Sequence, residues 1–134
     1  MALNILIGDA QPRVRFGLRL LLEQQPGWRI AGEAEDAQAL LDGVRCGCPD
    51  LVLLDWALPG MPAVELLAAL RRACPRLRVV FMSGNAELRP AALQAGADVF
   101  AYKADPPEHL LRLIRGLVAE KANRRACREK QAAL

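Results

Sequence analysis

The stretch LVLLDWALPGMP, residues Leu51–Pro62, decides the fold class of this chain. Four aliphatic residues run directly into a single carboxylate, Asp55, and the proline and glycine that follow indicate a turn. An apolar run without polar alternation is typical of a central strand in a parallel sheet, because such a strand is buried on both faces. Asp55 is therefore predicted to stand at the carboxyl end of a central strand.

Short aliphatic runs alternate with longer segments of helical periodicity on both sides of this stretch. We predict strands over residues 3–8, 28–34, 50–55, 77–83 and 98–102, and helices over residues 12–24, 36–47, 62–74, about 90–94 and 106–121. Pro12 suits the first turn of a helix, Asp36 is a candidate N-cap, and Gly96 suits a helix C-terminus. Five strand–helix units are too few for an eight-fold barrel, so we predict a doubly wound α/β sandwich with strand order 2-1-3-4-5.

The composition is that of one folded domain. The chain has 134 residues, of which 53% are hydrophobic, and this is enough apolar material for a core. No apolar run approaches the roughly 20 residues that a membrane-spanning helix needs. The opening residues MALNILIGDA lack the pattern of a secretory signal. We therefore expect a cytoplasmic protein without a membrane partner.

Four cysteines occur, at Cys46, Cys48, Cys74 and Cys127. In a cytoplasmic protein we expect them to be reduced thiols. The segment Cys46-Gly47-Cys48 also fits a redox pair or half of a metal site. No second Cys/His pair at zinc spacing accompanies it, which argues against the metal site.

The net charge of +3 is concentrated at the C-terminal end of the chain. Residues 120–134 hold five basic and two acidic side chains, whereas the remaining residues hold 13 of each sign. The neutral globular part gives no support for a nucleic-acid surface on the domain itself. We expect the basic end to be a solvated helical tail or the start of a linker.

Polar side chains close four of the predicted strands, at Asp9, Asp55, Ser83 and Lys103. In the predicted order these strands are neighbours, and the carboxyl ends of parallel strands meet at one edge of the sheet. Taken singly, each residue has an ordinary explanation, such as a helix cap for Asp9 or a solvated side chain for Lys103. Taken together, they predict a site with two carboxylates, one hydroxyl and one ammonium group.

Such a set of groups suits phosphoryl transfer to a carboxylate. A carboxylate can attack phosphorus and form an aspartyl-phosphate. The charge of the transferred group is neutralised by cations and hydrogen-bond donors, here Lys103, a hydroxyl and a Mg²⁺ ion held by carboxylate oxygens. Asp55, at the central strand, is the best-placed nucleophile.

At these residues the chain resembles the receiver domain of bacterial two-component response regulators. The resemblance covers about residues 3–120 and rests on the segments ILIGDAQPRVRFGLRLLLE, IAGEAEDAQALL, PDLVLLDWALPGMPAVELL, VVFMSGNAE and AGADVFAYKADPPEHLLRLIR, which stand in the expected order. The segments QPRVRFGLRLLLE and GEAEDA are most similar to regulators with a C-terminal helix-turn-helix output domain. The resemblance implies a flavodoxin-like fold and a phosphoacceptor signalling domain, with no enzymatic activity beyond self-phosphorylation and self-dephosphorylation.

The resemblance also implies a role for each residue at the predicted edge. Asp55 would accept the phosphoryl group, Lys103 would pair with that group, and Ser83 would donate a hydrogen bond to it. Mg²⁺ would be held by Asp9, Asp55 and the backbone carbonyl of Ala57. An aspartate-dependent phosphatase would need a second acid at position 57, so the alanine there argues against that enzyme class.

One departure from the family pattern affects the metal. The family usually has two adjacent acids after the first strand, and here the second is Ala10. This change is expected to weaken Mg²⁺ binding and to slow or prevent phosphorylation. The alternative function is therefore a pseudo-receiver, a protein-interaction module that takes no phosphate.

The implied partners are a sensor histidine kinase and an output domain. Ser83 and Phe100 stand at the family's switch positions, where the aromatic ring turns inward as the hydroxyl moves toward the phosphoryl group. The surface of the fourth helix, fifth strand and last helix would then engage an output domain, on the same or a separate chain, that binds DNA and controls transcription. We expect a receiver domain over residues 1–119, a tail over 120–134, and a capacity to form homodimers.

Overall fold

The computed structural model describes residues 2–132 of the chain and the side chains of residues 2–120. Five strands form one parallel sheet in the order β2-β1-β3-β4-β5. The predicted fold class, a flavodoxin-like α/β sandwich with strand order 2-1-3-4-5, is confirmed. The elements follow one another as β1 (Leu3–Gly8), α1 (Pro12–Glu23), β2 (Trp28–Ala34), α2 (Ala37–Cys46), β3 (Leu51–Asp55), α3 (Ala63–Ala73), β4 (Arg78–Ser83), the 3₁₀ helix η1 (Ala86–Leu88), α4 (Arg89–Gln94), β5 (Val99–Tyr102) and α5 (Pro107–Ala132).

The last helix is longer than predicted, since α5 continues to Ala132 and the expected end was residue 121. The residues after Gly116 include neither glycine nor proline and are mostly strong helix formers, which explains the extension. The boundary predicted between residues 119 and 120 falls inside this helix and stays a prediction. The structure does not describe the side chains of residues 121–134, which include most of the charged residues of the predicted tail. Neither α5 nor any other helix among residues 2–132 is both long and apolar enough to cross a membrane.

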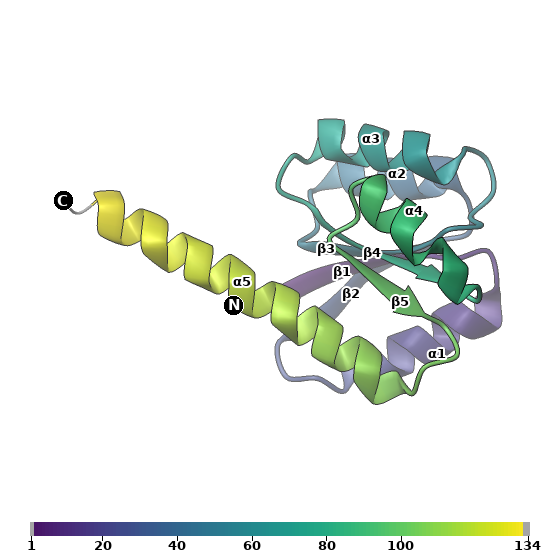
Figure 1. Cartoon of the computed structure of the whole chain (residues 1–134), viewed down its shortest axis with the longest axis horizontal. Helices are drawn as coiled ribbons and strands as arrows, with labels where there is room; N and C mark the ends of the chain where they lie inside the picture. The colour runs from purple at the N-terminus through teal and green to yellow at the C-terminus, as the bar shows by residue number, and fades with distance from the viewer. Residues whose placement is uncertain (1, 133–134) are drawn as a thin grey trace. The chain divides into compact units, whose positions relative to one another are not determined.

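The chain forms two compact units, residues 1–104 and 105–134. The first unit holds the sheet and α1 to α4, and the second consists mainly of α5. Within the first unit, α2, α3 and α4 lie on one face of the sheet and α1 lies on the other (Figure 1). This arrangement buries the central strands and leaves the strand ends at the edges.

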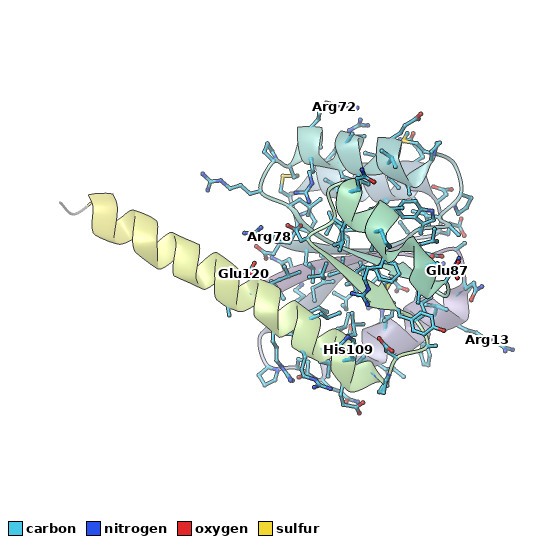
Figure 2. All side chains as sticks on the ribbon, viewed as in Figure 1. Arg13, Arg72, Arg78, Glu87, His109 and Glu120 are labelled. Atoms are coloured by element: carbon cyan, nitrogen blue, oxygen red, sulfur yellow. A yellow bond between two sulfur atoms is a disulfide. The ribbon has the colours of Figure 1, made fainter. Side chains whose placement is uncertain are left out.

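The core of the first unit follows from alternation along the strands. Leu6 and Phe81 belong to one buried cluster with side chains of α2 and α3. Ile5 is also fully buried, and because it alternates with Leu6 it faces the α1 side of the sheet. Charged side chains such as Arg13 and Arg72 project from the helices into solvent (Figure 2).

Local signals place three helix ends, at Pro12, Asp36 and Gly96, as the sequence predicted. The Asp36 side chain accepts a hydrogen bond from the Ala39 N–H at 2.8 Å, which confirms it as the N-cap of α2. Pro12 occupies the first turn of α1. Gly96 follows α4 with a φ of +108°, a left-handed conformation that glycine adopts without strain, so α4 ends there.

Cys48 and Cys74 form a disulfide, with Cα atoms 5.8 Å apart. The expectation of reduced thiols is therefore wrong for these two residues. They are 26 positions apart and come together only when α3 folds back along β3, so their spacing in the sequence gave no sign of the pair. Cys46 is an exposed free thiol, and Cys127 lies outside the described side chains.

Candidate functional site

Strand pairing brings the four predicted strand-end residues to one edge of the sheet. The residue before Asp9 pairs with the residue before Asp55 in the register of β1 and β3. The residue before Ser83 pairs with Asp55 itself, and Ser83 pairs with the residue before Lys103. These four residues are called the strand-end site below.

The side chain of Lys103 links the two carboxylates of the strand-end site. Its Nζ lies 2.7 Å from Asp9 Oδ2 and 3.3 Å from Asp55 Oδ2. The structure therefore brings together three of the four predicted side chains in direct contact. One positive charge faces two negative charges, so the site retains an excess of negative charge and can attract a further cation.

Asp9 is held in place by its own surroundings. Its side chain is fully buried, and its Oδ1 accepts a hydrogen bond from the Gln11 N–H at 2.9 Å. Its Oδ2 accepts the short hydrogen bond from Lys103. A buried carboxylate is stable only when it is paired in this way, so Asp9 and Lys103 fix each other.

Asp55 is more accessible than Asp9. Its side chain is 13% exposed, and its Oδ1 accepts a long hydrogen bond of 3.3 Å from the Ala57 N–H. Ala57 itself is exposed. A partly exposed carboxylate held by one long hydrogen bond and by the ion pair with Lys103 can approach a group from solvent, as a nucleophile must.

Ser83 is at the strand-end site but is turned toward a neighbouring loop. Its hydroxyl oxygen accepts a hydrogen bond from the Asn85 N–H at 3.0 Å. Within the described part of the chain it is not hydrogen-bonded to the side chain of Asp55 or Lys103. Its backbone carbonyl accepts a hydrogen bond from the Lys103 N–H at 2.8 Å, which fixes the position from which the lysine side chain starts.

Phe100, the predicted switch residue, is buried, with 1% of its surface exposed. The guanidinium group of Arg89 on α4 lies over its ring, 5.2 Å from the ring centroid. A cation over an aromatic face is attracted to the ring, so this contact favours the inward position of Phe100. Its role as a switch stays a prediction.

The donors at the strand-end site fit a Mg²⁺ ion held by few protein ligands. Mg²⁺ is commonly bound through one or two carboxylates, with water and phosphate oxygens completing the octahedron. Asp9 and Asp55 supply two carboxylates, but one oxygen of each contacts Lys103, and Ala10 adds none. Among the described residues, no three acidic, histidine or cysteine side chains form a metal-binding group. We therefore expect weak binding.

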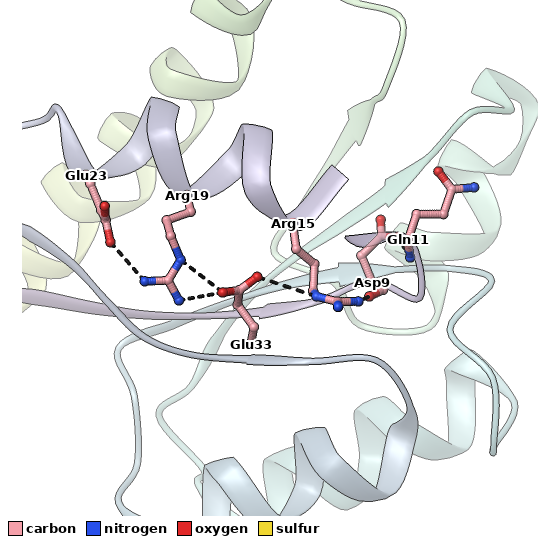
Figure 3. Close-up of polar contacts among 6 residues, drawn as sticks. All are labelled: Asp9, Gln11, Arg15, Arg19, Glu23 and Glu33. Carbon is pink, nitrogen blue, oxygen red and sulfur yellow. Dashed lines mark hydrogen bonds and ion pairs between the residues drawn. The ribbon is translucent and has the colours of Figure 1, made fainter. Parts of the chain in front are cut away.

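A row of alternating charges extends from α1 to the strand-end site (Figure 3). Arg15 donates a 2.6 Å hydrogen bond to the Asp9 backbone carbonyl, and its Nε lies 3.4 Å from Glu33. Glu33 also accepts from Arg19, which pairs with Glu23, and the hydrogen bond to Glu33 raises the pKa of Arg19 above its usual value. Sequence reasoning missed Arg15, because an arginine in an amphipathic helix gives no sign of which backbone group it reaches.

Trp56, next to Asp55, is positioned to report on the site. Its backbone N–H donates to the Met82 carbonyl at 2.9 Å, so its main chain is tied to β4. Its ring is half-buried and packs against Phe81, with ring centroids 5.1 Å apart and planes tilted by 60°. A change at Asp55 is therefore expected to alter the surroundings of this indole.

Comparisons of sequence and of structure with known proteins both find response regulators. The family model of the response regulator receiver domain matches residues 5–115. The transcriptional activator protein ExaE of Pseudomonas putida is 35% identical over 119 residues, which make up 87% of this chain and 56% of that protein. The chain spans about half the length of the curated relatives that it matches.

Two solved structures illustrate the similarity of fold. A LuxR-family two-component response regulator from Aurantimonas sp. SI85-9A1 matches with a TM-score of 0.82 and 29% identity, covering 90% of this chain and 87% of that one. RcsB from Salmonella enterica serovar Typhimurium, bound to promoter rprA in the presence of the phosphomimetic BeF₃⁻, matches with a TM-score of 0.82 and 25% identity, covering 89% of this chain and 61% of that one.

Proposed function

Because this chain belongs to the response regulator receiver domain family, as its sequence predicted, we propose that Asp55 accepts a phosphoryl group from a partner histidine kinase. The observation that carries this proposal is the ammonium group of Lys103, 2.7 Å from Asp9 and 3.3 Å from Asp55. A cation held beside a carboxylate at a strand end is placed to neutralise the charge that arrives with a phosphoryl group.

In the proposed reaction, a carboxylate oxygen of Asp55 attacks the phosphorus of a phosphohistidine on the kinase. A P–O bond forms and the P–N bond breaks, and its electron pair goes to the imidazole nitrogen, which takes up a proton from solvent. Lys103 is already within reach of the Asp55 oxygens and pairs with the phosphoryl group. The Ser83 hydroxyl accepts from Asn85 and so has its own hydrogen to donate to the phosphoryl group.

Mg²⁺ held by Asp9, Asp55 and the Ala57 carbonyl would add positive charge at the phosphoryl oxygens. The rest of the reaction depends on the chain's own residues. Arg15 holds the backbone of Asp9, and the buried side chain of Asp9 holds Lys103 until the phosphoryl group arrives. Positioning by these residues is the main contribution that a protein makes to phosphoryl transfer.

The proposed output is control of transcription in the cytoplasm. Movement of Ser83 toward the phosphoryl group would be followed by Phe100 and would change the surface of α4 and β5. That surface would engage a DNA-binding output domain, on the same or another chain, or a second copy of the domain. Two relatives support this reading, since ExaE is named a transcriptional activator and RcsB was solved on a promoter with a phosphomimetic.

Incubation with acetyl phosphate and Mg²⁺, followed by intact-mass measurement, tests phosphorylation. The wild-type chain should gain the mass of one phosphoryl group, and Asp55→Asn should not. In a Trp28→Phe background, which leaves Trp56 as the only indole, beryllofluoride with Mg²⁺ should shift the emission. A wild-type chain with neither a mass gain nor an emission shift would contradict the proposal.

A second function, the pseudo-receiver, is favoured by one observation. Ala10 leaves the strand-end site with two carboxylates, and both contact Lys103. A site in this form could serve as a structural ion-pair cluster, with regulation through protein contacts alone. The same mass measurement separates the two functions, because a pseudo-receiver makes wild type and Asp55→Asn indistinguishable.

A further inference from the structure

Three cysteines form a cluster near the start of β3. Cys46 and Cys48 are close in the sequence, and Cys74 is close to Cys48 in space. Cys48 is joined to Cys74 by the disulfide. Cys46, two residues before Cys48, is the last residue of α2 and an exposed free thiol. The strand-end site lies at the opposite, carboxyl end of β3, so this cluster is separate from Asp55.

The two sulfur atoms of the disulfide have different surroundings. Cys48 is exposed, whereas Cys74 is 3% exposed and belongs to the hydrophobic cluster of the first unit. Cys48 is therefore the residue of the pair that a thiolate from solvent or from a neighbouring residue can approach, and Cys74 is the shielded one. A released Cys74 thiol would remain in an apolar pocket, where a free cysteine packs as a small hydrophobic residue.

The spacing allows Cys46 to reach Cys48. Two residues of chain span at most about 7 Å, and bridged cysteines need a Cα separation of about 4.4–6.8 Å. The residue between them is Gly47, and a Cβ added there would meet no atom within 4 Å, so the backbone has room to bend. Cys46 and Gly47 also line a cavity of about 280 Å³ between α2 and β2, so this segment borders open space.

We propose that Cys48 is a thiol–disulfide exchange site, with Cys46 as the attacking thiol and Cys74 as the leaving thiol. The Cys46 thiolate attacks Cys48 Sγ, the Cys46–Cys48 bond forms, and the Cys48–Cys74 bond breaks. Cys74 leaves as a thiolate and takes up the proton that Cys46 lost, so no net oxidation or reduction occurs. An external dithiol can then reduce the exposed Cys46–Cys48 bond and leave three thiols.

This exchange would give the chain a redox-sensitive site that does not depend on phosphorylation of Asp55. The Cys48–Cys74 bond closes the segment that contains β3, the loop after Asp55 and α3. Exchange opens that segment and releases the end of α3. Disulfides in cytoplasmic proteins are mostly transient and redox-sensing, which fits a bond with an exposed sulfur and a third thiol two residues away.

Disulfide mapping of the full chain with Cys127→Ser tests the proposal. The oxidised chain is held at neutral pH, its free thiols are blocked with N-ethylmaleimide under acidic conditions, and it is then digested with trypsin. Cys46 and Cys48 fall in one tryptic peptide, residues 46–71, and Cys74 in another, residues 73–76. The resting bond joins these peptides. In the exchanged form the two peptides are separate, and the larger one is lighter by two hydrogens than the same peptide with both cysteines reduced. We expect both forms in the chain that keeps Cys46, Cys48 and Cys74.

Cys46→Ser is the matched variant, because it removes the attacking thiol and keeps the Cys48–Cys74 bond. It should show only the joined peptides, and a dithiol should reduce it at least about tenfold more slowly, since the internal thiol acts at a high effective concentration. The proposal is overturned if the exchanged form is missing and both chains are reduced at the same rate. A folded chain isolated with all three cysteines as thiols in air would also overturn it.

Discussion

At the scale of single residues, the charge balance around Asp9 determines how the strand-end site can work. Asp9 is fully buried, and its two oxygens are satisfied by the Gln11 N–H and by Lys103. Lys103 is also 3.3 Å from Asp55. A phosphoryl group on Asp55 would therefore compete with Asp9 for the same ammonium group, and loss of that partner is costly for a buried carboxylate.

Lys103→Met should lower the free energy of unfolding by about 1–3 kcal/mol, because Asp9 stays buried without its counter-charge. Lys103 is 26% exposed, so the loss should be smaller than for a fully buried pair. Urea denaturation measures it. The double variant Asp9→Asn, Lys103→Met should recover part of the loss, because no uncompensated charge remains. If the loss of unfolding free energy in the double variant equals the sum of the losses in the two single variants, Asp9 and Lys103 are not coupled.

Ala10→Asp should strengthen Mg²⁺ binding about tenfold, because affinity for a hard cation rises with the number of charged oxygen ligands. Mg²⁺ titration of Trp56 emission in the Trp28→Phe background measures the dissociation constant. Ala10→Asn is the matched control, since it adds similar volume without a charge. Equal affinities for the two variants would mean that position 10 does not face the metal.

At the scale of elements, α2 depends on a single cap that sequence and structure agree on. The Asp36 side chain accepts a hydrogen bond from the Ala39 N–H at 2.8 Å. Asp36→Ala leaves this N–H at the helix start unpaired and should cost about 1 kcal/mol in urea denaturation. Glu35→Ala, at the exposed neighbouring acid, should cost much less. Similar losses of stability in Asp36→Ala and Glu35→Ala would mean that negative charge near the start of α2, and not the cap hydrogen bond, stabilises the helix.

The elements were predictable where one local signal dominates. The apolar run before Asp55 fixed β3, and the N-cap at Asp36 fixed the start of α2. The end of α5 was not predictable from periodicity, because the residues up to Ala132 are helical by propensity and not by an apolar stripe. Strand bounds were within one residue because aliphatic runs and turn residues alternate sharply along this chain.

The sequence predicted which residues form the strand-end site, but it did not predict the contacts between their side chains. Strand order alone placed Asp9, Asp55, Ser83 and Lys103 at one edge, because parallel strands end together. The Lys103 bridge and the bond from Arg15 to the Asp9 carbonyl depend on side-chain directions that no sequence pattern encodes. The resemblance supplied roles, and these stay predictions until phosphorylation is measured.

At the scale of the whole molecule, one covalent bond affects the unit that carries Asp55. The segment from Cys48 to Cys74 contains β3, the turn after Asp55 and α3. Closing such a segment removes conformations from the unfolded chain, and the loss of entropy stabilises the folded state by about 3 kcal/mol for a loop of this length. The bond and the strand-end site lie at opposite ends of β3, so stability and site chemistry can be altered separately.

Breaking this bond should lower Tm by about 10 °C, because about 3 kcal/mol is large relative to the unfolding entropy of a domain of this size. Cys48→Ser is the variant of choice, since Cys48 is exposed and its replacement leaves the buried core intact. Thermal unfolding followed by circular dichroism measures the shift, and dithiothreitol should produce the same shift in wild type but none in Cys48→Ser. Cys46→Ser should melt at or slightly above the wild-type temperature, because it keeps the Cys48–Cys74 bond and lacks the thiol that exchanges it. A Cys48→Ser chain that melts at the wild-type temperature would show that the disulfide contributes nothing to the stability of the fold.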